Sequence, residues 1–421
     1  MNFQNTLAFA QQLDEQDSLK HFRNQFYIPL INGKESIYFT GNSLGLQPKT
    51  TQHYVQNELE DWANFGVEGH FHARKPWLSY HEQFPELLSK ITGALPEELV
   101  VMNQLTVNLH LLMATFYQPT KEKYKIICEA KAFPSDQYAL ESQVKFHGFD
   151  PGNAIIEVAP RVNEYSIRTE DIVVSIQQHA KETALVIFGG VNYYSGEVFD
   201  MKAIASAAHA ARIYCGFDLA HAAGNIDLKL HDWDVDFACW CSYKYLNSGP
   251  GGVAGAFIHQ RHISNTELPR LAGWWGYDKA TRFQMEKGFK PIATAEGWQV
   301  SNAPVLSMAA HKASLDIFNE AGMENLVAKG KMLSDYLYFI IDKLNGSLHK
   351  KVIEVITPRK EKGCQLSMLM LKKGEEVFEA LKQNGVLADW REPNVIRVAP
   401  VPLYNSFEDV FTFGQIISKI L

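Results

Sequence analysis

Three apolar runs in the middle of the chain lead directly to residues that could do chemistry. The run from residue 213 ends at Asp218, the run from residue 237 ends at Lys244, and the run from residue 125 leads to Phe133. Strands that are apolar throughout are typical of a sheet covered on both faces, and ligands bind at the carboxyl ends of such strands. We therefore expect the carboxylate, the amine and the aromatic ring to meet at one edge of a sheet.

A lysine, an aspartate and an aromatic ring that converge in this way suit pyridoxal phosphate. The lysine binds this cofactor as a Schiff base, a carboxylate keeps its ring nitrogen protonated, and an aromatic face can stack on the flat ring. The helix pattern that opens around Thr106 could supply N–H donors to the phosphate. Alone, each residue has a plain alternative: Lys244 as a solvated strand end, Asp218 as a helix N-cap and Phe133 as packing. Together they favour the cofactor.

The elements that must position these residues alternate along the chain. Apolar runs that predict strands cover residues 124–130, 154–159, 184–189, 213–218, 237–242 and 253–258. A helical pattern over residues 201–212 lies between two of them, which is typical of a mostly parallel sheet in an α/β domain. The C-terminal third predicts helices and strands over residues 324–344, 351–356, 365–371, 375–384 and 407–421. We interpret it as a smaller α+β unit.

The composition excludes several classes of protein. The 421 residues include 40 Lys and Arg against 47 Asp and Glu, which gives a net charge of −7. A basic surface that binds nucleic acid or an anionic membrane is therefore not expected. No apolar stretch approaches the roughly 18 residues of a membrane span, and the N-terminus lacks the pattern of a secretory signal. We expect a cytoplasmic protein with a small-molecule substrate and with neither nucleic-acid nor membrane partners.

The cysteines, histidines and glycines offer weaker alternatives. Most of the five cysteines lie inside apolar runs, where they are typical of small core residues and predict no disulfide framework. The pairs His70 and His72, and Cys239 and Cys241, lack the second pair of a zinc site, so no metal is expected. The glycine-rich stretch 249–254 formally fits a dinucleotide motif, but it precedes a strand pattern instead of a helix.

Longer stretches of the sequence resemble the kynureninases. The matching segments are residues 41–49, 105–113, 131–136, 216–225, 231–233, 236–247, 273–276, 300–302 and 394–404. The resemblance covers nearly the whole chain. It implies the aminotransferase-like fold type I of pyridoxal-phosphate enzymes, with a large domain of seven mostly parallel strands over residues 41–305. Residues 1–40 and 306–421 would form a small α+β domain, and the protein would be a homodimer with shared active sites.

The resemblance implies roles for residues that match the family's motifs. Lys244 would be the Schiff-base lysine, Tyr243 a proton donor that touches the phosphate, and Asp218 the partner of the ring nitrogen. The implied cofactor-binding set is Leu105, Thr106, Phe133, Pro134, Ser135, Asp136, Asp218, His221, Tyr243, Lys244, Trp274 and Asn302. Of these, Trp274 and Asn302 would come from the partner subunit.

The implied substrate-binding set is Ser43, His70, Asn302 and Arg397. Arg397 matches the arginine that clamps the substrate α-carboxylate. The other three resemble the aryl end of the pocket in animal-type enzymes, which favour 3-hydroxykynurenine, and a histidine and an amide can hydrogen-bond the extra hydroxyl. The alternative is that His70 only packs or caps a loop. One position departs from the family, because animal members carry a serine near the cofactor where this chain has Gly189.

The implied reaction is the hydrolysis of L-kynurenine or L-3-hydroxykynurenine to anthranilate or 3-hydroxyanthranilate and L-alanine. Such an enzyme is a hydrolase of carbon–carbon bonds in ketonic substances and serves tryptophan catabolism and NAD biosynthesis. A cysteine desulfurase of the same fold type is an alternative. It needs a reactive loop cysteine, for which Cys364 is the exposed-looking candidate. A non-catalytic protein that binds the cofactor is a second alternative, and the complete catalytic set speaks against it.

Overall fold

The large sheet has seven strands in the order β4-β10-β9-β8-β7-β5-β6. They are β4 (Leu99–Val101), β5 (Lys125–Glu129), β6 (Ile155–Val158), β7 (Thr183–Gly189), β8 (Tyr214–Asp218), β9 (Phe237–Trp240) and β10 (Gly255–Ile258). Strands β5 to β9 run parallel, whereas β10 is antiparallel to both β9 and β4. The structure is a computed structural model that describes residues 2–421. The predicted α/β class and mostly parallel sheet are confirmed; only β4 was not predicted, because three residues are too few for a pattern.

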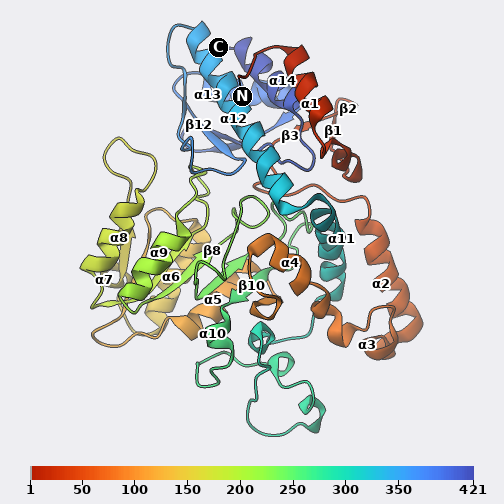
Figure 1. Ribbon diagram of the computed structural model, residues 1–421, viewed down its shortest axis with the longest axis vertical. Helices are drawn as coiled ribbons and strands as arrows, with labels where there is room; N and C mark the ends of the chain where they lie inside the picture. The colour runs from red at the N-terminus through yellow and green to blue at the C-terminus, as the bar shows by residue number, and fades with distance from the viewer. Residues whose placement is uncertain (1) are drawn as a thin grey trace.

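Helices cover both faces of this sheet, as its apolar strands require (Figure 1). Helices α5 (Leu105–Phe116) and α6 (Pro134–Phe146) pack on one face, where Ile126 and Cys128 of β5 point. Helices α8 (Thr169–Gln178) and α9 (Met201–Ala210) pack on the other face with Ile127. Because neighbouring strand residues alternate between faces, each strand contributes to two separate hydrophobic cores.

A second, smaller sheet lies at the other end of the molecule (Figure 1). Its four antiparallel strands are β11 (Ile353–Val355), β12 (Leu366–Met370), β15 (Val395–Val398) and β14 (Asp389–Arg391), in that order. It is covered by α1 (Leu7–Gln16), α12 (Met323–Ser347), α13 (Gly374–Gln383) and α14 (Phe407–Ser418). The N-terminal helix α1, red in Figure 1, therefore shares a core with the C-terminal helix α14.

Helix α11 (Val305–Ala321) packs on α2 (Thr51–Phe65) and belongs to the core of the large sheet, and α12 continues from it to the small sheet. The predicted boundaries at residues 40 and 305 stay a prediction. The remaining strands and α-helices of the described residues are β1 (Leu30–Ile31), β2 (Lys34–Glu35), β3 (Ile37–Tyr38), β13 (Val386–Leu387), α3 (Gly69–His72), α4 (Pro85–Thr92), α7 (Pro151–Ala154) and α10 (Gln260–Ile263). Among residues 2–421, no helix combines the length and the apolar character that crossing a membrane requires.

Candidate active site

One cavity lies at the carboxyl ends of the central strands and gathers most of the predicted site. The predicted residues that line it are Leu105, Thr106, Phe133, Ser135, Asp136, Asp218, His221, Tyr243 and Lys244. The residues that complete its lining are Glu129, Gly189, Val191, Tyr193, Ala220 and Cys241. These residues therefore lie together at the carboxyl ends of the parallel strands, where ligands bind in sheets of this kind.

Lys244 is the cation of this cavity. Its side chain is 9% exposed, and its Nζ lies 3.1 Å from Nε2 of His221 and 5.7 Å from the centre of the Phe133 ring. Burial, followed by the nearby charge of Lys244, holds the pKa of His221 well below its usual range. The imidazole is therefore neutral, and its Nε2 accepts the hydrogen bond from the amine. Nδ1 of His221 is buried and has no hydrogen-bond partner among the described residues.

Three carboxyl groups form the floor of the cavity. Asp218 ends β8, where its Oδ1 accepts a hydrogen bond of 2.7 Å from the Ala220 N–H. Burial raises the pKa of Asp218, and burial together with the charge of Asp218 raises that of Asp136 well above its usual range. Burial also raises the pKa of Glu129, at the end of β5, to about 7. The cavity therefore holds more acid than its lysine can neutralise.

Two helices begin at the cavity wall. Gln104 makes no side-chain cap at the start of α5, so the first N–H groups of that helix are free to bind an anion. Pro134 does not line the cavity; it occupies the first turn of α6, a position that suits its fixed φ. Thr106 Oγ1 and Ser135 Oγ, from the two helix starts, lie 2.7 Å apart. The two starts can therefore hold one phosphate group together.

These features match what pyridoxal phosphate needs. Oδ1 of Asp136 and Nδ1 of His221 are buried polar atoms without a protein partner among residues 2–421. A polar ring bound in this cavity would supply the hydrogen bonds that these two atoms lack. The amine of Lys244 suits the aldehyde of the cofactor, the carboxyl group of Asp218 suits its ring nitrogen, and the two helix starts suit its phosphate.

Comparison with known proteins decides the family. A model described as "Kynureninase C-terminal domain" matches residues 326–417. The kynureninase of Flavobacterium psychrophilum is 57% identical over 421 residues, which cover 100% of this chain and 99% of that protein. The chain belongs to the kynureninase family. The kynureninase of Mus musculus is 45% identical and covers 98% of this chain and 92% of its own, so the resemblance found in the sequence is confirmed.

Solved structures place this kynureninase-family chain in a wider fold. A C-DES protein with glycine linked covalently to its PLP cofactor has a TM-score of 0.77 at 15% identity and covers 94% of this chain and 98% of its own. A cysteine desulfurase from Thermococcus onnurineus has a TM-score of 0.74 at 16% identity and covers 91% of this chain and 94% of its own. At such identities the likeness concerns the fold alone. The predicted fold type I architecture is confirmed.

Besides Pro134, five of the predicted residues do not line the cavity. Ser43 and Asn302 are exposed, and Trp274 is 45% exposed. His70 and Asn302 line a separate, mostly apolar hollow of about 450 Å³. Arg397 is fully buried beside the cavity, since its guanidinium donates to the Tyr193 carbonyl at 2.6 Å and Tyr193 lines the cavity.

The prediction that Cys364 is exposed is wrong. Its side chain is 2% exposed, and its backbone N–H donates to Asn225, which lies 139 residues earlier in the chain. Burial raises the pKa of its thiol to about 12. A thiol that stays protonated is a poor nucleophile, so the structure gives no support to a desulfurase reaction at this cysteine.

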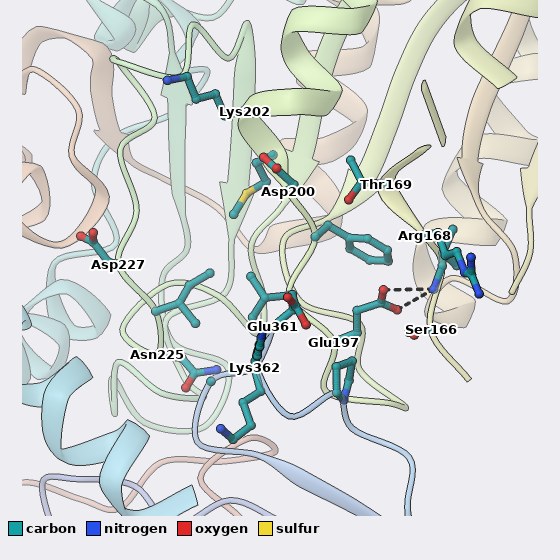
Figure 2. Close-up of a pocket in the computed structure, with 18 of the residues that line it drawn as sticks. Ser166, Arg168, Thr169, Glu197, Asp200, Lys202, Asn225, Asp227, Glu361 and Lys362 are labelled. Carbon is teal, nitrogen blue, oxygen red and sulfur yellow. Dashed lines mark hydrogen bonds between the residues drawn. The ribbon is translucent and has the colours of Figure 1, made fainter. Parts of the chain in front are cut away.

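A much larger cavity, of about 750 Å³, lies between the loop before α9 and residues 358–363 (Figure 2). Figure 2 shows Glu197 turned toward the segment of Ser166 and Arg168, where both its carboxylate oxygens accept from the Ile167 N–H. None of the predicted site residues lines this cavity. The chemistry of the lining, and not the volume, therefore identifies the candidate active site.

Sequence reasoning missed Glu129 and Tyr193. The signal for Glu129 was present, because a carboxylate ends the apolar run of β5 just as Asp218 ends the run of β8. Tyr193 has no comparable signal. It reaches the cavity because the loop after β7 is hydrogen-bonded to the small sheet through Gln365 and Arg397, and these contacts span more than 170 residues.

Proposed function

We propose that the cavity around Lys244 is the active site at which this chain hydrolyses L-kynurenine and L-3-hydroxykynurenine to L-alanine and the corresponding anthranilate. Kynureninase activity and the pyridoxal-phosphate cofactor come with membership of the family, and the assignment of residues is our proposal. The observation that carries it is the burial of the Lys244 amine in one cavity with Asp218, His221 and two helix starts.

The residues around the cavity would hold each part of the cofactor. The helix starts at Leu105, Thr106 and Ser135 offer N–H and hydroxyl donors to the phosphate. Asp218 would face the ring nitrogen, with Phe133 against the ring. When bound, pyridoxal phosphate takes up the electrons released from bonds to the substrate α- and β-carbons.

The protein's own part is to bind, orient and move protons. The amine of Lys244, held by the neutral His221, would remove the proton from the substrate α-carbon. Burial raises the pKa of Tyr243 well above its usual range, so its phenol keeps its proton. That phenol is suited to deliver the proton that completes the methyl group of alanine. Water adds to the γ-carbonyl before the carbon–carbon bond breaks.

Substrate recognition would fall to residues at the edge of the cavity. Arg397 is the proposed partner of the substrate α-carboxylate, since its guanidinium is next to the cavity and has fork geometry. Ser43, His70 and Asn302 are proposed for the aryl end. We infer a preference for L-3-hydroxykynurenine, because an imidazole and an amide can hydrogen-bond the added hydroxyl.

We further propose a homodimer with shared active sites. The hollow that contains His70 and Asn302 is also lined by Trp62 and Leu306, whose side chains are 60% and 40% exposed. Exposed apolar side chains around a hollow are typical of protein interfaces. A second copy seated there would cover this surface and could bring Trp274 and Asn302 to the neighbouring cavity.

Two other parts of the proposal concern the whole chain. We propose a large domain over residues 41–305 and a small domain over 1–40 and 306–421, in which helix α11 is the part of the small domain that packs on the core of the large one. The shared core of α1 and α14 supports the joining of the two chain ends. We also propose a cytoplasmic location. Five free, buried cysteines fit a reducing compartment.

Product analysis tests the reaction and the preference. The purified holoenzyme receives equal amounts of L-kynurenine and L-3-hydroxykynurenine, and the products are measured by mass spectrometry. We expect L-alanine with 3-hydroxyanthranilate in excess over anthranilate. An excess of anthranilate would contradict the roles of His70 and Asn302, and cleavage of neither substrate would contradict the function itself.

Mixing two inactive variants tests the shared site. In a dimer formed from Lys244→Ala and Asn302→Ala chains, one site carries both substitutions and the other carries neither. Random exchange of subunits makes half of the dimers mixed, so we expect about a quarter of the wild-type activity to return. If each site belongs to one chain, mixing restores nothing.

A further inference from the structure

Three neighbouring strands end side by side beneath the cavity. Strands β5, β7 and β8 are adjacent in the sheet and end in Glu129, Gly189 and Asp218. Gly189 is paired in register with Asp218 and separates it from β5. Since the middle strand ends in a residue without a side chain, the two flanking carboxyl groups face the same space.

The carboxyl group of Glu129 fits the space that Gly189 leaves. Its Oε1 accepts a hydrogen bond of 3.0 Å from the Gly189 N–H. A Cβ atom added at Gly189 would lie 3.1 Å from that same oxygen, closer than an ordinary contact. The absence of a side chain at 189 therefore holds the Glu129 carboxyl at the cavity, where it forms part of the lining.

The groups that face Glu129 are mostly acids. Asp218 approaches from β8 and Asp136 from α6, while Glu197 lies on the loop after β7 and the Cys128 thiol precedes Glu129 on β5. Burial first, and the charge of Asp218 second, raise the pKa of Glu129. The amine of Lys244 lies on the side of Asp218 and Asp136 and attracts their charges.

We propose that Glu129 is a positioning residue for the cofactor, which holds a proton in the free protein and releases it when a protonated ring nitrogen is bound against Asp218. The proton leaves the Glu129 carboxyl for solvent, and no electrons move. The floor thereby gains one negative charge when a positive charge arrives above it. The inference rests on the proposed function in one respect, namely that the ring nitrogen faces Asp218.

The pH dependence of cofactor affinity tests this role. The dissociation constant of pyridoxal 5′-phosphate is measured from pH 6 to pH 8 for the wild type and for Glu129→Gln. Glutamine keeps the oxygen that accepts from Gly189 but cannot ionise. We expect the wild type to gain affinity over the variant with rising pH, on the order of tenfold across this range. Parallel curves would overturn the proposal, because they are what a purely structural role predicts.

Two further variants complete the experiment. Glu157→Gln, at an exposed position on the neighbouring strand β6, is the matched control and should follow the wild type at every pH. If Glu129→Gln does not fold, Gly189→Ala takes its place, because the added Cβ displaces the carboxyl without removing it. That variant should shift the pH at which the affinity changes, and an unshifted curve would overturn the proposal.

The outcomes for the inference and for the proposed function are separable. Lys244→Ala must abolish the covalent attachment of the cofactor if the cavity is the active site, whatever Glu129 does. A cofactor that still attaches covalently in that variant contradicts the proposed function. If covalent attachment is lost in Lys244→Ala but the curves of cofactor affinity against pH are parallel for the wild type and Glu129→Gln, only the inference is contradicted.

Discussion

The two ends of the central strands carry similar residues in opposite electrostatic states. At the carboxyl ends, Glu129, Asp136 and Asp218 share one cavity with a single lysine, and burial raises the pKa of each. At the amino ends, burial also acts on Asp236, yet hydrogen bonds from His209, His262 and the Cys215 N–H lower its pKa.

The buried carboxyl groups at the amino ends of the strands accept hydrogen bonds from neighbouring residues of the protein. Asp236 also receives a hydrogen bond of 2.5 Å from Arg261. Nearby, Glu98 accepts from His231 at 2.9 Å and from the backbone N–H groups of Leu95 and Gln260 at 2.8 Å. One possible ligand atom from each of Glu98, His231 and His259 lies within 4.8 Å of the others, as in a metal site, but both oxygens of the Glu98 carboxylate already accept hydrogen bonds from the protein.

The carboxyl groups at the two ends of the sheet therefore serve different purposes, stability at the amino ends and function at the carboxyl ends. Acids matched by cations and N–H groups stabilise the fold, because their charged form is favoured in the native state. Acids that crowd around one amine destabilise the free protein and are useful only to a ligand that brings positive charge. Substitutions at the two ends should therefore affect different measurements.

The largest expected effect is that of Lys244→Ala. We expect cleavage activity to fall by at least about 10³-fold, because the variant lacks both the cofactor-binding amine and the base. The unfolding free energy should not fall, since the substitution removes a buried cation from a site built for a ligand. Activity assays and urea unfolding of the cofactor-free protein measure the two. A strong loss of stability would contradict the comparison, because it would make Lys244 a structural cation.

Asp236→Asn tests the opposite end. The variant leaves Arg261 and two histidines without their carboxylate, and we expect a loss of about 3 kcal/mol in unfolding free energy. Its kcat should match the wild type at a temperature where both are folded. Asp234→Asn is the control, because Asp234 is 60% exposed and should cost less than about 1 kcal/mol. A fall in kcat without a fall in stability would contradict the division of roles.

How much the sequence predicts depends on the range of the contacts. Asp218 and Lys244 could be found because an apolar run that ends in a charge is a local signal, and the sheet brings such ends together. Glu129 carries the same signal, but Phe133, four residues later, also follows this apolar run and is the residue that the cofactor pattern selects.

Contacts between distant segments could not be predicted in the same way. Arg397 of the small sheet donates to the carbonyl of Tyr193, on the loop after β7, at 2.6 Å, although the two residues are 204 positions apart in the chain. The Lys-Gly-Cys sequence suggests that Cys364 lies in an exposed loop, but the backbone N–H of Cys364 donates a hydrogen bond to the side chain of Asn225, which belongs to the large-sheet part of the molecule. Both facts depend on packing between the two sheets, which no local pattern contains.

The stability of the cofactor-free protein should depend on pH through Glu129. An unfolded glutamate has a pKa of about 4.3, whereas burial raises that of Glu129 to about 7. The native state therefore binds the proton more tightly, so stability present below pH 4 is lost as the pH rises toward 7. The contribution is on the order of 3 kcal/mol. Urea unfolding at pH 5 and pH 8 should show a smaller decline for Glu129→Gln than for the wild type, and equal declines would contradict it.

The smallest effect is expected for His231→Ala at the amino end. Glu98 is fully buried, but two backbone N–H groups remain to bind it when the imidazole is removed. His231 is itself 27% exposed, so the substitution removes one charge-assisted hydrogen bond and little packing. We expect a loss of about 1.5 kcal/mol in urea unfolding at pH 7, with kcat unchanged. A loss as large as that of Asp236→Asn would mean that the two backbone donors do not satisfy Glu98, and the stability of the amino end would then depend on its histidines.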